Sequence, residues 1–122
     1  VLKVNAKFLD LFGEILMKNV RDEAIEQWRM TIQGKMKSEE SQRIHNLISL
    51  SGQNELINEL VPKIVDTTLH HLLWILEQNK SIDVTINDGN KAVSIKEISD
   101  GLAGELYTED GWINRFSNEA KS

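Results

Sequence analysis

The sequence contains no cysteine among its 122 residues, which excludes disulfide bonds, thiol catalysis and cysteine-ligated zinc. It has a single proline and no linker rich in proline or glycine. The longest uninterrupted apolar run covers residues 72–76, far short of the roughly 20 residues that a membrane-spanning helix needs. No N-terminal stretch has the order of a signal peptide. We therefore expect one globular domain, residues 1–122, in the cytoplasm and without membrane contact.

Positive charge is also scarce. The chain carries 14 basic and 19 acidic residues, and its formal net charge is −5. The imbalance is largest in residues 83–122, which hold 4 basic and 8 acidic side chains. A surface of this sign repels phosphate backbones, so nucleic-acid binding lacks its electrostatic attraction. An acidic surface favours a basic protein partner instead, and it speeds the encounter with one.

Helical periodicity dominates the first part of the chain. Apolar residues at helical spacing predict helices over 5–18 and 20–33, which are either two helices or one bent helix. Gly34 is a plausible stop for the second. Ser38, which precedes two glutamates, predicts the start of the next helix, and residues 51–54 predict a turn.

The strongest pattern covers residues 54–79. When 56–77 are placed on a helix, nine apolar side chains cover about half of its circumference. So broad an arc predicts a central helix packed against at least two others. Pro62 is expected to begin the helix proper, where its missing N–H costs nothing, or to kink a longer helix. The nine apolar residues are Ile57, Val61, Ile64, Val65, Leu69, Leu72, Leu73, Ile75 and Leu76.

Residues 82–86 do not follow helical periodicity, because apolar and polar side chains alternate there. This pattern predicts a half-buried strand. The Asp-Gly pair within residues 87–90 favours a tight hairpin turn, and residues 91–94 are the expected return strand. A lone hairpin is marginally stable in water, so this one is expected to lie against helices.

Two further helices are expected near the C-terminal end. Ser94 and Glu97 have the spacing of a capping box in front of a helix over 95–107. Thr108 is expected to cap a last short helix. The predicted fold class is therefore mainly α (α+β): a compact helical domain of about five helices with one small antiparallel β-hairpin near 82–94.

The polar side of the central helix carries candidate chemistry. Asp66 and His70 stand at positions i and i+4, where a carboxylate can orient an imidazole for acid–base catalysis or for a metal. A catalytic metal site usually needs about three protein ligands around one point, whereas Asp66 and Glu77 are separated by roughly 16 Å of helix axis. Since no catalytic or metal motif appears, the sequence predicts no catalytic residue, metal or cofactor, and a solvated helix face is favoured.

Aromatic side chains near polar residues are the second candidate feature. Trp74 stands on the polar side of the central helix, so we expect the hairpin, the last helix or a second subunit to cover it. In residues 99–112, four acidic side chains and small residues surround Tyr107 and Trp112. Close helix packing with acidic caps is the favoured interpretation. A carboxylate-lined pocket closed by aromatic rings is the alternative.

Two functions remain open. The first is a small acidic interaction or regulatory module, not an enzyme, that acts through a protein surface as a homodimer or with a basic partner. The alternative is a small-molecule-binding domain or small hydrolase with a pocket between helix 62–79 and segment 95–116. The candidate ligand or interface residues are Asp66, His70, His71, Trp74, Glu77, Asp100, Tyr107 and Trp112.

Overall fold

The computed structural model describes residues 2–87 and 89–119. It is mainly helical with one small two-stranded antiparallel sheet, as predicted. The elements are α1 (Leu2–Leu16), η1 (Met17–Arg21), α2 (Asp22–Ile32), α3 (Glu39–Ser51), α4 (Asn54–Gln78), β1 (Thr85–Asn87), β2 (Ala92–Ser94), α5 (Ile95–Ile98), η2 (Ala103–Leu106) and α6 (Trp112–Phe116). Across the described ranges, we find no helix with the length and apolarity needed to span a bilayer.

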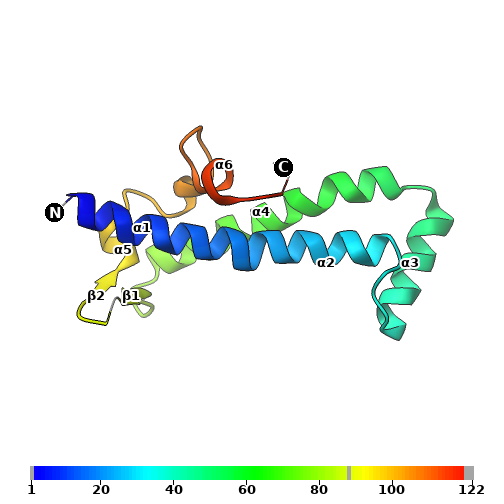
Figure 1. Cartoon of the computed structure of the whole chain (residues 1–122), viewed down its shortest axis with the longest axis horizontal. Coiled ribbons are helices and arrows are strands. Elements are labelled where there is room, and N and C mark those ends of the chain that lie inside the picture. The colour runs from blue at the N-terminus through cyan, green and yellow to red at the C-terminus, as the bar shows by residue number, and fades with distance from the viewer. Residues whose placement is uncertain (1, 88, 120–122) are drawn as a thin grey trace.

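The first three elements form one continuous helix along the longest axis of the molecule (Figure 1). A single π-helical turn, η1, widens it between α1 and α2. Leu16 and Asp22, on either side of this turn, keep right-handed helical dihedral angles, so the chain does not break there. The sequence left open whether residues 5–18 and 20–33 form one helix or two, and the structure has one. Gly34, with φ +80°, follows the end of α2, as predicted for a helix stop.

After the corner made by α3, α4 runs back beside the long helix (Figure 1). Of the two predictions for Pro62, the one in which it begins the helix is wrong, because α4 starts at Asn54 and Pro62 lies buried inside the longer helix of the alternative. An interior proline removes one backbone hydrogen bond. The apolar periodicity continues on both sides of it, and burial of the ring offsets part of that cost.

The hydrophobic core lies where the C-terminal segments cover α4 and the first half of the long helix (Figure 1). Trp112 of α6 is its largest fully buried side chain. The indole occupies the space that a Cβ on Gly13 would take, and it meets Phe12 edge-on with 5.7 Å between ring centroids. Gly13 therefore lowers the helical propensity of α1, but its missing side chain leaves room for Trp112 of α6 to pack against α1.

The hairpin is shorter than predicted. β1 and β2 pair with Ile86 opposite Val93, and Val93 is buried. Residue 82 lies outside the ladder, where the Ile82 carbonyl accepts a hydrogen bond from Lys96 Nζ at 2.7 Å. Residue 88 of the predicted Asp-Gly turn falls outside the described residues, while Gly89 has φ +94°. As expected, the hairpin lies against the helices, since Ile86 packs against the hydrophobic core cluster that Leu69 and Leu73 of α4 help to form.

The predicted helix over 95–107 is wrong. The chain forms two short helices, α5 and η2, with a turn between them in which Ser99 Oγ accepts the Gly101 N–H at 3.1 Å. Serine and glycine favour such local turns over helix continuation. The apolar side chains that suggested one helix are still buried, and they reach the core from two separate turns. These residues are Ile95, Leu102 and Leu106.

One predicted helix cap is confirmed and two are wrong. Ser38 caps α3 and accepts a backbone N–H from its first turn. Ser94 is the N-cap of α5, but its side chain accepts no backbone N–H and so forms no capping box; its hydroxyl donates to Asp83 at 2.6 Å. Thr108 does not begin α6, whose N-cap is Gly111. Thr108 instead has φ 58°, an unusual value for a β-branched residue.

Candidate functional site: the outer face of α4 and the junctions beneath it

α4 has two apolar sides. One side packs inward and includes Leu69 and Leu73. The opposite side is exposed, and six of its large apolar side chains have relative exposures of 40–60%. The prediction that all nine apolar residues face inward is therefore wrong for Ile64, Leu72 and Ile75. The outer face of α4 is defined as Leu56, Leu60, Ile64, Thr67, Thr68, His71, Leu72, Trp74 and Ile75, all of them exposed.

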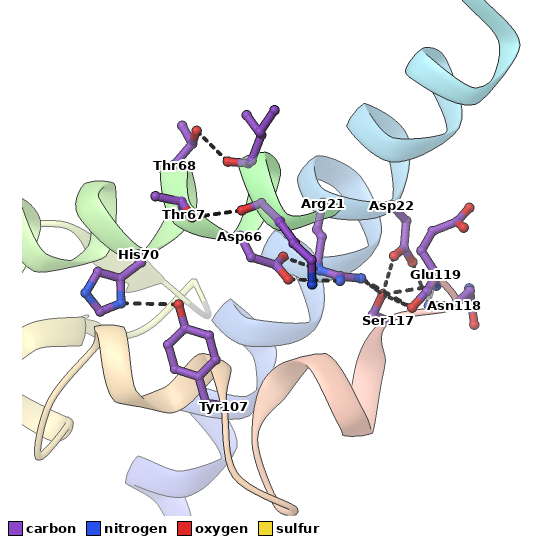
Figure 2. Close-up of polar contacts among 12 residues, drawn as sticks. Arg21, Asp22, Asp66, Thr67, Thr68, His70, Tyr107, Ser117, Asn118 and Glu119 are labelled. Carbon is purple, nitrogen blue, oxygen red and sulfur yellow. Dashed lines mark hydrogen bonds and ion pairs between the residues drawn. The ribbon is translucent and has the colours of Figure 1, made fainter. Parts of the chain in front are cut away.

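No charged residue belongs to this outer face. At 3.6 residues per turn, every charged side chain of α4 projects at least about 100° away from the direction of Ile64. Those side chains are Glu55, Glu59, Lys63, Asp66 and Glu77. The exposed polar groups at the middle of the face are bonded within the helix: Thr67 Oγ donates to the Lys63 carbonyl and Thr68 Oγ to that of Ile64, both at 2.8 Å (Figure 2). These hydroxyls keep a partner when water is removed.

On the inward side, Asp66 forms a buried ion pair with Arg21 of η1. Arg21 Nε lies 2.6 Å from Asp66 Oδ1, and Arg21 Nη2 lies 3.1 Å from Oδ2. The relative exposures of the two residues are 0% and 3%. The prediction that Asp66 lies on a polar helix face is wrong, because the fork-shaped guanidinium of another helix satisfies both carboxylate oxygens inside the fold.

The same arginine binds the C-terminal segment. Arg21 Nη1 donates to Ser117 Oγ at 2.7 Å and to the Glu119 carbonyl at 3.3 Å. Asp22 accepts the Ser117 hydroxyl and, at 2.9 Å, the Asn118 N–H (Figure 2). Sequence reasoning missed Arg21 and Ser117. The signal was a charged residue placed four residues after Met17 and four before Ile25, which are both buried.

His70 contacts Tyr107, which follows η2, and not Asp66. Tyr107 Oη and His70 Nδ1 are 3.2 Å apart, and Figure 2 shows Asp66 and His70 pointing to different partners. Burial raises the pKa of Tyr107, and the negative charge of Asp66 raises it further. The His71 ring meets the His70 ring edge-on, with 5.5 Å between centroids. The contact between His70 and Tyr107 is one place where the structure brings candidate residues of α4 and segment 95–116 together.

The remaining candidates serve separate purposes. The Glu77 carboxylate accepts the Leu102 N–H and so joins α4 to the chain before η2. Asp100 is exposed, and its charge is the second cause, after burial, of a raised pKa at Glu105. Trp112 belongs to the core and cannot form the wall of an open pocket. The eight candidates therefore do not converge on one centre.

The close packing predicted around the small residues of 99–112 holds for Ala103, which is buried in the core, but not for two of the glycines. A Cβ added to Gly101 or Gly104 would meet nothing within 4 Å. At Gly111 it would clash with the Tyr107 carbonyl oxygen, so this glycine closes a tight loop. Asn114 Nδ2 holds that loop by donating to the Thr108 carbonyl at 2.8 Å.

A hollow between α2 and α4 is lined by none of the eight candidate residues. This hollow of about 310 Å³ is lined by Ile25 and Pro62, among others. Within residues 2–87 and 89–119, no three histidine or acidic side chains are grouped so that they could hold a metal ion. Comparison with protein-family models, curated proteins and solved structures finds no match for this chain.

Proposed function

We propose that this protein is a non-enzymatic interaction module of the cytoplasm that binds a protein chain through the outer face of α4. The supporting observation is the face itself, which exposes six large apolar side chains and no charge. Soluble monomers rarely expose contiguous apolar patches beyond a few hundred Å², and larger ones mark interaction sites. A chain without cysteine suits a reducing compartment.

The composition of the face supports a protein partner. The centres of protein interfaces are depleted of charge and enriched in aromatic residues, and charged side chains form their rim. Trp74 is half exposed on the outer face, and tryptophan is among the residues that most often dominate binding energy. Glu59 and Lys63 lie at its border. A partner chosen for basic charge fits less well, since the face has no carboxylate to attract it.

The contact between His70 and Tyr107 supports a second candidate, a small-molecule site between α4 and the segment after η2. Two other groups required for that pocket are engaged elsewhere, because Asp66 is paired with Arg21 and Trp112 is in the core. Of the predicted pocket groups, His70 and Tyr107 alone would then meet each other there. We therefore favour the interaction module.

Photo-crosslinking in cells that produce the protein tests the proposal. A photoreactive amino acid replaces Thr68 on the outer face, and in a matched variant it replaces Glu97, which is exposed on α5. Position 68 is expected to give a discrete protein adduct that position 97 does not. If neither position gives an adduct, or if both give the same ones, the proposed function is wrong.

A further inference from the structure

We propose that the chain bound to the outer face of α4 is a second copy of this protein. The two α4 helices would pack antiparallel about a two-fold axis that passes near Thr67 and Thr68. This inference rests on the proposed function, because it names the partner of the same face. Two-fold dimers are the commonest protein oligomers, and in them each residue pair occurs twice.

The arrangement of the outer face supports self-pairing. Its central line consists of residues 60, 64, 67, 68, 71 and 75. The intervals along this line are 4, 3, 1, 3 and 4 residues, the same in both directions. An antiparallel copy therefore places Leu60 opposite Ile75, Ile64 opposite His71, and the two threonines together at the centre. Threonine is small enough there for two helices to approach closely.

Charge limits a second copy to this face. The protein has a formal net charge of −5, so two copies repel one another over most of their surfaces. The outer face carries no charge, and pairing through it sets no like charges in direct contact. The bonded hydroxyls of Thr67 and Thr68 add no unsatisfied donor when water leaves the centre.

The size of the face predicts a reversible dimer. From residue 56 to residue 75 the face is about 28 Å long and about 10 Å wide. Such a contact falls at the small end of specific interfaces, below the roughly 800 Å² per partner of a standard one. Each copy also has a core of its own. We therefore expect folded monomers and dimers to exchange at micromolar concentrations.

Sedimentation of the purified chain over a range of concentrations tests the association. The molar mass is expected to double as concentration rises. Ile64→Glu should weaken the dimer at least about tenfold, since it places a carboxylate within the otherwise uncharged contact. Ile64 is 60% exposed in the monomer, so the fold should tolerate the change. Gln27→Glu adds the same charge at an exposed position of α2 and should leave the association unchanged.

Engineered cysteines test the antiparallel register, and the natural chain contributes no thiol of its own. Thr68→Cys should form a disulfide dimer under mild oxidation, because this position lies next to the axis. A mixture of Ile64→Cys and His71→Cys chains should give the mixed dimer in excess over either homodimer. Glu97→Cys should crosslink slowly. A wild-type dimer without these preferences would overturn the proposed pairing.

The outcomes separate this inference from the proposed function. A chain that stays monomeric at every concentration, while position 68 crosslinks in cells to a different protein, overturns the second copy and leaves the interaction module in place. A monomeric chain with no adduct at position 68 overturns both. Equal dimerisation of the Ile64→Glu and Gln27→Glu variants places the contact away from α4 and also overturns the inference.

Discussion

At the scale of single residues, the guanidinium of Arg21 joins three segments that are far apart in the sequence. It binds the carboxylate of Asp66 in α4 and the hydroxyl of Ser117 in the C-terminal segment, while its own backbone belongs to η1. Burying two charges costs several kcal/mol each, and close bidentate geometry repays most of this cost. The intact pair therefore adds little net stability. Removing one partner is costly, because the other charge is left buried without its counter-charge.

Arg21→Met is expected to destabilise the fold by about 3–5 kcal/mol, because it leaves the Asp66 carboxylate buried without its cation. The double variant Arg21→Met, Asp66→Leu should recover a large part of that loss. Urea unfolding of the two single variants and the double variant measures the coupling between the residues. Arg43→Met, at an exposed pair with Glu40 on α3, is the control and should leave the unfolding midpoint unchanged. Equal midpoints for the Arg21 and Arg43 variants would contradict the prediction.

Tyr107 gives a pH-dependent prediction at the same scale. It is the single tyrosine of the chain, so tyrosinate absorbance reports on it alone. Burial and then the charge of Asp66 raise its pKa in the folded protein. The associated stability is fully present below the unfolded pKa of about 10 and is lost as the pH rises through the folded pKa. The absorbance midpoint should be higher in buffer than in concentrated urea. Coincident midpoints would show that the fold leaves the ring as accessible as in the unfolded chain.

The sequence identifies Asp66, His70 and Tyr107 as candidates, but not their partners. Helical spacing places Asp66 beside His70, because both belong to one helix. Which of them is buried depends on an arginine 45 residues away. Nothing local indicates that pairing, apart from a charged residue interrupting an apolar stripe in each helix. The same limit left two interpretations of Trp112 open, close packing and a pocket wall, and its place in the core agrees with the first.

At the scale of elements, the sequence predicts which segments are helical better than where they end. Periodicity identifies the long first helix, α3, α4 and the hairpin, because it depends on residues close together in the chain. It fails between α5 and η2, where tertiary packing outweighs local preference. It also assigned Ile64, Leu72 and Ile75 of α4 to the core, although all three are exposed. Periodicity shows which side of a helix is apolar. Whether that side is buried depends on which other elements pack against it.

Gly13 tests the packing of α6 against α1. Gly13→Ala should destabilise the fold although alanine favours helices by about 1 kcal/mol, because the added methyl meets the indole of Trp112. Overpacking of this kind costs about 1–3 kcal/mol. Gly104→Ala is the matched control, since its Cβ would meet nothing within 4 Å. Thermal unfolding should show a lower midpoint for Gly13→Ala and little change for Gly104→Ala. A higher midpoint for Gly13→Ala would mean that the indole can move away.

At the scale of the whole molecule, the two ends of the long helix differ in how well they are covered. The C-terminal segments pack over α1 and the second half of α4, whereas α3 forms the opposite end with α2 and the beginning of α4 (Figure 1). On α3, Ile48 is buried, but Leu47 and Leu50 are 54% and 85% exposed. The end that contains α3 therefore has less apolar burial to hold it together than the end that contains Trp112.

This difference predicts a gradient of amide hydrogen exchange in the dilute, monomeric protein. Local opening costs least where few apolar contacts are lost. Amides of α3 and the first turns of α4 should exchange faster than those around Leu69 and Leu73, which are buried in the core. Exchange measured by mass spectrometry on peptic fragments resolves these segments, and uniform protection would contradict the account of the two ends.

Concentration adds a second test to the same experiment. If two outer faces pair, a higher protein concentration should slow exchange along α4 around Leu60 and Ile64, because opening that helix then also requires the dimer to separate. α3 lies outside the outer face and should keep its rate, and in Ile64→Glu the dependence on concentration should disappear. Slowing that is equal in both helices would indicate association through the α3 end instead. Exchange thereby distinguishes an end of the molecule that is merely thinly packed from a face that a second copy covers.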